Sequence, residues 1–79
     1  MHYVYILESL SMDERYYVGV TADLPARLKK HNAGDVTHTS KYRPWRIKTY
    51  IAFSGEPQAF QFEKYLKSAS GRAFAKKRL

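Results

Sequence analysis

The feature that most constrains the fold is a pair of strand-like segments near the N-terminus, joined by a short polar connection. Residues 2–8 are rich in Tyr, Val and Ile and alternate loosely, and residues 16–20 repeat this composition. The connection over 9–14 has loop length, so the two segments predict an antiparallel hairpin. Each strand also carries a phenol, Tyr5 and Tyr17, which strand formation does not require.

A helix and a long loop are expected after the hairpin. Asp23 is a good N-cap residue and Pro25 suits the first helical turn. Asn32 and Gly34 end this helix. Residues 34–44 are polar and basic, and they form a loop longer than the usual median of about 4–6 residues. Loops of that length are often functional.

The second half of the chain predicts one more strand and two more helices. Residues 45–54 alternate apolar and basic side chains at their start, which is typical of a strand. A helix with apolar residues at helical spacing begins at Glu56. Ser70-Gly71 interrupts that spacing, and residues 72–79 form a last short helix anchored by Phe74.

The predicted order is β-β-α-β-α-α, a small three-stranded, mostly antiparallel sheet with helices on its faces, which is an α+β fold. Seventy-nine residues form a single domain over 1–79. No cysteine is present, which excludes disulfides, thiolate zinc sites and a cysteine nucleophile. There is neither an apolar run of roughly 20 residues nor a signal-peptide pattern. We therefore expect a soluble, cytoplasmic protein with no membrane partner.

The positive charge is concentrated in the second half of the chain. Residues 1–35 hold four basic and five acidic side chains, whereas residues 36–79 hold ten basic and two acidic. A net charge of +7 on a small domain favours a polyanionic partner, with nucleic acid the first candidate. A basic surface without a dedicated partner remains the alternative.

Four side chains of the first half are candidates for chemistry. Arg27 and His31 lie four residues apart and share one helix face. A tyrosine base needs nearby cations because its reference pKa is about 10, and Arg27 with the basic second half would supply them to Tyr5 and Tyr17. The alternatives are solvated helix residues and sheet aromatics at the edge of the core.

Glu63 is the candidate metal ligand. It stands mid-helix beside Lys64 and Lys67 as one of only two acids after Asp35. Mg²⁺ typically binds one or two carboxylates, several waters and phosphate oxygens. The alternative is an i,i+4 salt bridge with Lys67.

Taken together, these residues resemble the GIY-YIG nuclease family. The residues that carry the likeness are the tripeptides Tyr3-Val4-Tyr5 and Tyr17-Val18-Gly19, then Arg27, His31 and Glu63. Eleven residues separate the two motif tyrosines, Tyr5 and Tyr17. The likeness covers nearly the whole chain and is closest to small stand-alone members, similar to the N-terminal nuclease module of the excision-repair incision subunit. It implies the same three-stranded fold.

The resemblance also implies a role for each motif residue. Tyr5 would be the general base for the attacking water, and Tyr17 would orient water or phosphate. Gly19 would leave the sheet surface open to substrate. Arg27 would stabilise phosphoryl charge and favour phenolate character. His31 would support the nucleophile or a phosphate.

The reaction implied is in-line hydrolysis of DNA, leaving a 5′-phosphate and a 3′-hydroxyl. Glu63 would hold one Mg²⁺ or Mn²⁺ ion. Structured or branched DNA, low sequence specificity and a role in repair or recombination fit this picture. The side chains expected to contact the DNA backbone without reading bases are Lys30, His38, Lys41, Arg43, Lys67, Arg72 and Lys76.

Two departures from the family pattern keep other functions open. The region after the metal helix has no asparagine, so Ser68 or Ser70 would have to replace it. The chain shows no separate DNA-binding domain, so a protein partner or a homo-oligomer would choose the target. The alternative function is a non-catalytic nucleic-acid-binding or adaptor module, and a domain that binds an acidic protein is a third.

Overall fold

The computed structural model describes all 79 residues and contains three strands and four helices. The strands are β1 (His2–Ser9), β2 (Tyr16–Thr21) and β3 (Trp45–Phe53). The helices are α1 (Leu24–Ala33), α2 (Thr37–Ser40), α3 (Glu56–Leu66) and α4 (Ala69–Arg78). The α+β fold class and the element types expected from the sequence are confirmed.

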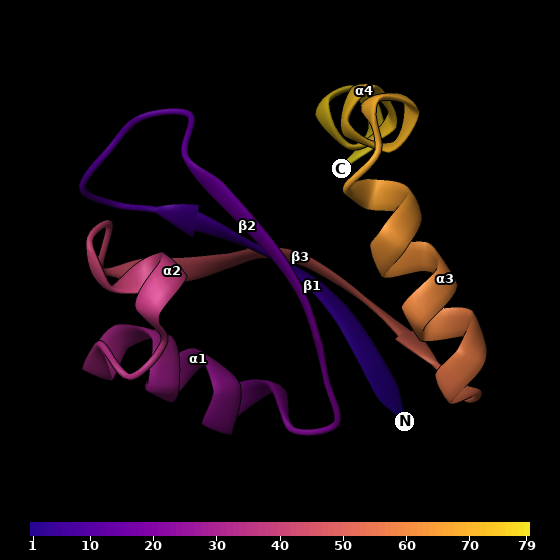
Figure 1. Cartoon of the computed structure of the whole chain (residues 1–79), viewed down its shortest axis with the longest axis horizontal. Coiled ribbons are helices and arrows are strands. Elements are labelled where there is room, and N and C mark those ends of the chain that lie inside the picture. Colours follow the sequence, from indigo (N-terminus) through magenta and orange to yellow (C-terminus); the bar gives the residue numbers. More distant parts are fainter.

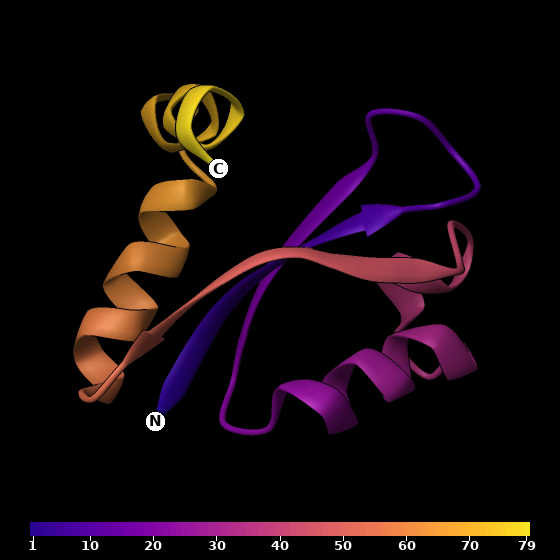
Figure 2. The same cartoon turned by 180° about the vertical axis from the view of Figure 1, so that it is seen from behind.

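The sheet has the order β2-β1-β3, and both pairings are antiparallel. Helices α1 and α2 lie on one side of the sheet, and α3 and α4 lie on the other (Figure 1). The view from behind shows the same separation (Figure 2). Strand β2 is an edge strand, so side chains from both layers of helices can reach it.

Because successive strand residues point to opposite faces, the central strand β1 supplies two different cores. Val4 and Ile6 pack with Ala59 and Leu66 beneath α3 and α4. On the other face, the buried cluster contains the following side chains: Tyr5, Leu7, Leu24 and Trp45. The first core is wholly apolar, whereas the second includes a phenol and an indole that need hydrogen-bond partners.

The long loop expected over 34–44 contains a short helix, α2. Its Thr39 is fully buried, with 0% of its surface exposed, and the Trp45 indole nitrogen donates a hydrogen bond to the Thr39 carbonyl at 2.8 Å. The Asn32 side chain also clamps Trp45, accepting from its backbone N–H and donating to its carbonyl. This segment is therefore packed against the ends of α1 and β3.

The break between the last two helices was placed wrongly at Ser70-Gly71. The helix α4 begins at Ala69, with the Ser68 hydroxyl accepting from the Gly71 backbone N–H as its cap. Gly71 is buried inside this helix. A Cβ at this position would overlap the Tyr65 carbonyl, so the close approach of the two segments requires glycine. Phe74 is 37% exposed and does not anchor the helix. That role falls to Ala75 and Leu79, which pack on the apolar core.

None of the helices has the length and apolar character needed to cross a bilayer.

Candidate active site

A buried hydrogen bond between Tyr5 and His31 forms the centre of the site. Tyr5 on β1 is 2% exposed and His31 on α1 is 0% exposed, and the Tyr5 hydroxyl lies 2.9 Å from His31 Nε2. Gly19 sits opposite Tyr5 on β2. A Cβ at Gly19 would overlap the phenol oxygen, so this glycine makes room for Tyr5. The expected role of Gly19, keeping the sheet open to substrate, is therefore wrong.

Thr39 on α2 sets the protonation pattern of this pair. Its hydroxyl donates to the Val36 carbonyl at 3.3 Å and lies 2.7 Å from His31 Nδ1. We infer that the hydroxyl proton is directed to Val36, in which case the hydroxyl accepts from a protonated Nδ1. His31 Nε2 is then the unprotonated nitrogen and accepts from the Tyr5 hydroxyl.

The pKa values of both groups favour neutral forms. Burial raises the pKa of Tyr5 to about 12, with further contributions from Tyr17 and Glu63, while Arg27 acts in the opposite direction. Burial, followed by Arg27, lowers the pKa of His31. The expectation that cations would make Tyr5 a ready phenolate was wrong in direction, because desolvation outweighs the guanidinium.

Of the other three predicted site residues, Tyr17 packs directly against this pair. The Tyr17 ring is partly exposed and lies 5.0 Å from the His31 ring, centroid to centroid, and 6.4 Å from that of Tyr5. Arg27 on α1 and Glu63 on α3 both act electrostatically on the Tyr5 phenol, although α1 and α3 cover opposite faces of the sheet. Tyr5, Tyr17 and His31 therefore lie in direct contact, whereas Arg27 and Glu63 influence the Tyr5 phenol only electrostatically and approach it from opposite faces of the sheet.

Glu63 fits a metal ligand of the kind that keeps most of its water. No group of three or more His, Cys, Asp or Glu side chains is arranged to hold an ion. One carboxylate is nevertheless a sufficient protein contribution for Mg²⁺, which completes its shell with waters and substrate phosphate oxygens. Glu63 Oε2 also accepts from the Lys67 ammonium at 3.1 Å, and the Glu63 side chain is 20% exposed. The salt bridge considered as the alternative is therefore present.

The predicted DNA-contacting residues fall on two separate surfaces. Lys30 lies on α1, and His38, Lys41 and Arg43 lie in or after α2, on the side of the phenol site. The remaining three lie at the end of α3 and along α4, on the other side of the sheet: Lys67, Arg72 and Lys76. The structure does not bring the seven together into one patch.

Sequence reasoning missed Thr39, and the structure gives Ser68 a capping role. Thr39 was assigned to an irregular loop, and nothing in Thr37–Ser40 marks one threonine as buried. A signal was available in His31, because a buried histidine needs a partner for each ring nitrogen. Ser68, considered as a replacement for the missing asparagine, caps α4 and donates to the Tyr65 carbonyl at 2.6 Å.

Comparison with known proteins identifies the family of this chain. The sequence profile of the GIY-YIG catalytic domain matches residues 1–78. The chain belongs to the GIY-YIG family. The UPF0213 protein BH0048 of Halalkalibacterium halodurans is 38% identical over 72 residues, which cover 90% of this chain and 74% of the relative. A UPF0213 protein of Halobacterium salinarum is 34% identical, covering 89% of this chain and 90% of the relative.

Similarity extends to solved structures and to a named enzyme subunit. The solution NMR structure of the UPF0213 protein BH0048 from Bacillus halodurans aligns with a TM-score of 0.57 at 36% identity, covering 95% of this chain and 79% of that one. The structure-specific endonuclease subunit SLX1 of Scheffersomyces stipitis is 37% identical over 67 residues, 76% of this chain but only 20% of the relative. Together these similarities support a nuclease.

Proposed function

We propose that this GIY-YIG protein is a metal-dependent endonuclease that hydrolyses DNA phosphodiester bonds with low sequence specificity. The observation that carries the proposal is the Tyr5–His31–Thr39 hydrogen-bond chain, with the charges of Arg27 and Glu63 acting on the same phenol. A buried, neutral histidine that accepts from a tyrosine is a proton acceptor held ready for use.

The chain of hydrogen bonds defines where a proton goes. As the attacking water gives a proton to the Tyr5 oxygen, the Tyr5 proton moves to His31 Nε2. The resulting imidazolium keeps its Nδ1–H on Thr39. Because Tyr5 is never left as a free phenolate, its raised pKa does not prevent this step. In this proposal His31 is the final acceptor, at a cost set by its lowered pKa, and the general-base role expected for Tyr5 becomes that of a relay.

Tyr17 and Arg27 face the substrate in this proposal. The partly exposed Tyr17 hydroxyl would orient the water or a phosphate oxygen. The Arg27 guanidinium would stabilise charge that develops on the phosphoryl oxygens, an effect that such donors exert most strongly in a preorganised site. In-line attack would leave a 5′-phosphate and a 3′-hydroxyl.

Glu63 would hold one Mg²⁺ or Mn²⁺ ion. Such an ion polarises the scissile phosphate and stabilises the leaving oxygen. The Lys67 ammonium is paired with Oε2, so an ion would bind through the other carboxylate oxygen or displace this ammonium.

DNA is the proposed substrate, and branched DNA is included because relatives are named structure-specific endonuclease subunits. A protein partner or a second copy of the chain would supply target choice. A role in repair or recombination and a cytoplasmic location complete the proposal.

Nicking of supercoiled plasmid and of a labelled branched duplex in Mg²⁺ or Mn²⁺ tests the proposal. We expect cleavage by the wild type, none in EDTA, and loss of roughly 10²-fold or more in Glu63→Ala. The matched control is Glu56→Ala, which removes the same charge from an exposed position of the same helix. An inactive wild type, or equal nicking by Glu63→Ala, would contradict the proposal.

A non-catalytic nucleic-acid-binding or adaptor module is the second candidate. The Glu63–Lys67 ion pair favours it, because a carboxylate already neutralised by an ammonium is a weaker metal ligand. Binding that persists in EDTA and falls steeply with salt, without cleavage in any metal, would support this function instead.

A further inference from the structure

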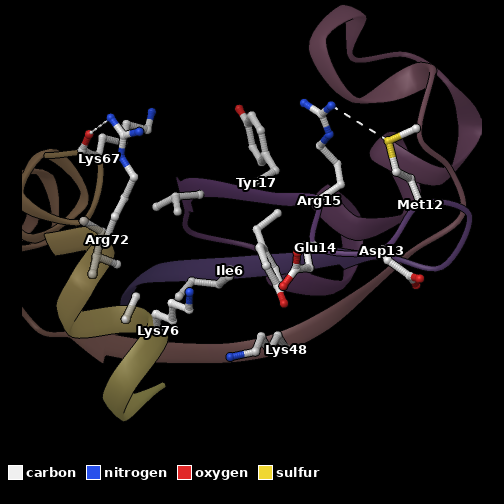
Figure 3. A pocket seen from close by; sticks show the side chains of 14 residues that line it. Ile6, Met12, Asp13, Glu14, Arg15, Tyr17, Lys48, Lys67, Arg72 and Lys76 are labelled. Carbon is white, nitrogen blue, oxygen red and sulfur yellow. Dashed lines mark hydrogen bonds between the residues drawn. The ribbon is translucent and has the colours of Figure 1, made fainter. Parts of the chain in front are cut away.

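A large open groove lies on the side of the sheet that carries α3 and α4. It has a volume of about 790 Å³ and runs between the β1–β2 connection and α4. Figure 3 shows Ile6 at its floor, Arg72 and Lys76 on one side, and Asp13 and Glu14 on the other. The size falls within the roughly 300–1,000 Å³ that accommodates a drug-sized ligand.

The two walls differ in charge and the floor is apolar. Arg72, Lys76 and Lys67 supply the helix wall, and Lys48 on β3 adds a fourth cation. The opposite wall carries the two carboxylates together with the Arg15 guanidinium, a fifth cation. Tyr16 lines the same groove, is 48% exposed, and has the Lys48 ammonium 5.8 Å from its ring centroid.

We propose that this groove binds a single-stranded segment of nucleic acid, with its phosphates along the α4 wall and a base stacked on Tyr16. The inference rests on the proposed function and names its substrate class: DNA with a single-stranded arm next to the cleaved duplex. An aromatic platform combined with a cationic track is the usual arrangement for binding single strands without sequence preference.

A duplex uses this groove less well than a single strand does. Duplex bases are stacked inside the helix, so a duplex would contact only the cations at the rim and leave Tyr16 and the apolar floor exposed. In a single strand the bases are free to stack. Their amino groups can also donate to the Asp13 and Glu14 carboxylates on the side opposite α4.

The groove connects with the catalytic site through two residues. Tyr17 lines the groove and also lies against His31. Lys67 lines the groove while its ammonium is bonded to Glu63. A strand that leaves the scissile phosphate at the β2 edge can therefore pass directly into the groove on the far side of the sheet.

The role of the cations on the α4 wall is tested by measuring binding of a fluorescein-labelled single-stranded oligodeoxynucleotide. Fluorescence anisotropy is recorded in EDTA at several salt concentrations. Lys76→Gln should weaken binding and reduce the salt slope by about 0.7, the value for one lost contact with a single strand. Lys77→Gln removes the same charge from the next residue of α4, which does not line the groove. It should leave the slope unchanged, and equal effects of the two variants would overturn the proposal.

The aromatic platform is tested with Tyr16→Leu and Tyr16→Phe. Loss of one base–aromatic stack should weaken single-strand binding by about five-fold or more, while the phenylalanine ring preserves it. Duplex binding should change little. Normal single-strand binding by Tyr16→Leu, or an equal loss for duplex, would overturn the inference. Because binding in EDTA needs no cleavage, an inactive wild type would contradict the proposed function but leave this test intact.

Discussion

The two faces of the central strand β1 pack against cores of different chemical character. Toward α3 and α4, β1 presents Val4 and Ile6 to an apolar core whose members need no partners. Toward α1 and α2 it presents Tyr5, whose hydroxyl continues into His31 and Thr39. No buried side-chain nitrogen or oxygen lacks a hydrogen-bond partner.

This difference shows how a 79-residue chain combines stability with a reactive site. An apolar core tolerates changes of shape at a cost set by the lost contacts. A polar network fails abruptly when one partner is removed, because the other group stays buried and unpaired. Substitutions in the apolar core toward α3 and α4 should therefore act on stability alone, whereas those in the Tyr5–His31–Thr39 network should act on chemistry as well as on stability.

The largest effect that would separate the two faces is expected for Tyr5→Phe. It removes the relay hydroxyl, so cleavage should fall by roughly 10²- to 10⁴-fold, the range for loss of a proton-transfer group. Initial rates of plasmid nicking measure it. The control is Tyr3→Phe, which lies on the same strand with its ring against Tyr50. Activity retained in Tyr5→Phe, together with a large drop in melting temperature, would mark Tyr5 as structural.

Leu66→Ala tests the apolar face. Leu66, at the end of α3, is 2% exposed in the apolar core. Its truncation should therefore lower the free energy of unfolding by about 2–5 kcal/mol. Urea denaturation followed by circular dichroism measures the change. Leu66→Met conserves volume and should cost less than about 1.5 kcal/mol. If folded Leu66→Ala protein lost its nicking rate as Tyr5→Phe does, the division between the faces would be wrong.

Thr39→Val sharpens the comparison, because it keeps the shape of Thr39 and removes the acceptor for His31 Nδ1–H. Stability should fall by about 1–3 kcal/mol, the cost of one unsatisfied buried group. Nitrogen-15 NMR of the imidazole should show Nδ1 protonated in the wild type and a changed tautomer balance in the variant. Thr39→Ser restores the hydroxyl and should restore the wild-type spectrum; an unchanged spectrum in Thr39→Val would argue against the tautomer assignment.

The smallest effect is a pH dependence of stability. The lowered pKa of His31 means that the unfolded chain takes up a proton at a higher pH than the folded protein does. Stability should therefore decline as the pH falls below the ordinary histidine value of 6.5. Melting temperatures between pH 8 and 5 measure this slope. His31→Gln should flatten it relative to His38→Gln, which alters an exposed histidine; identical slopes would contradict the prediction.

Much of this architecture could be predicted because it depends on local patterns. The hairpin, the Asp23 cap of α1 and the third strand follow from residues close in sequence, and the structure has each of them. The site residues Tyr5 and His31 were identified through a family resemblance. Their direct bond spans 26 positions, and spacing alone could not reveal it.

The features that escaped prediction depend on contacts between distant segments. Burial of Thr39 requires α1, α2 and β3 to meet. Gly71 looked like a helix breaker, yet it lies inside α4 where the chain passes close to the Tyr65 carbonyl. The direction of the Tyr5 pKa shift was missed because charge counts along the sequence say nothing of desolvation.

The Glu63–Lys67 bond has a thermodynamic consequence. If a divalent ion displaced the Lys67 ammonium from the carboxylate, the ammonium would be free to bind a phosphate in the proposed single-strand groove, and a phosphate bound to this ammonium would leave the carboxylate free for the ion. Occupancy of either position would then increase affinity at the other by the same factor. Lys67 alone would thus couple binding of the metal ion to binding of the single-stranded arm. The ion would be bound most tightly when the DNA is also bound.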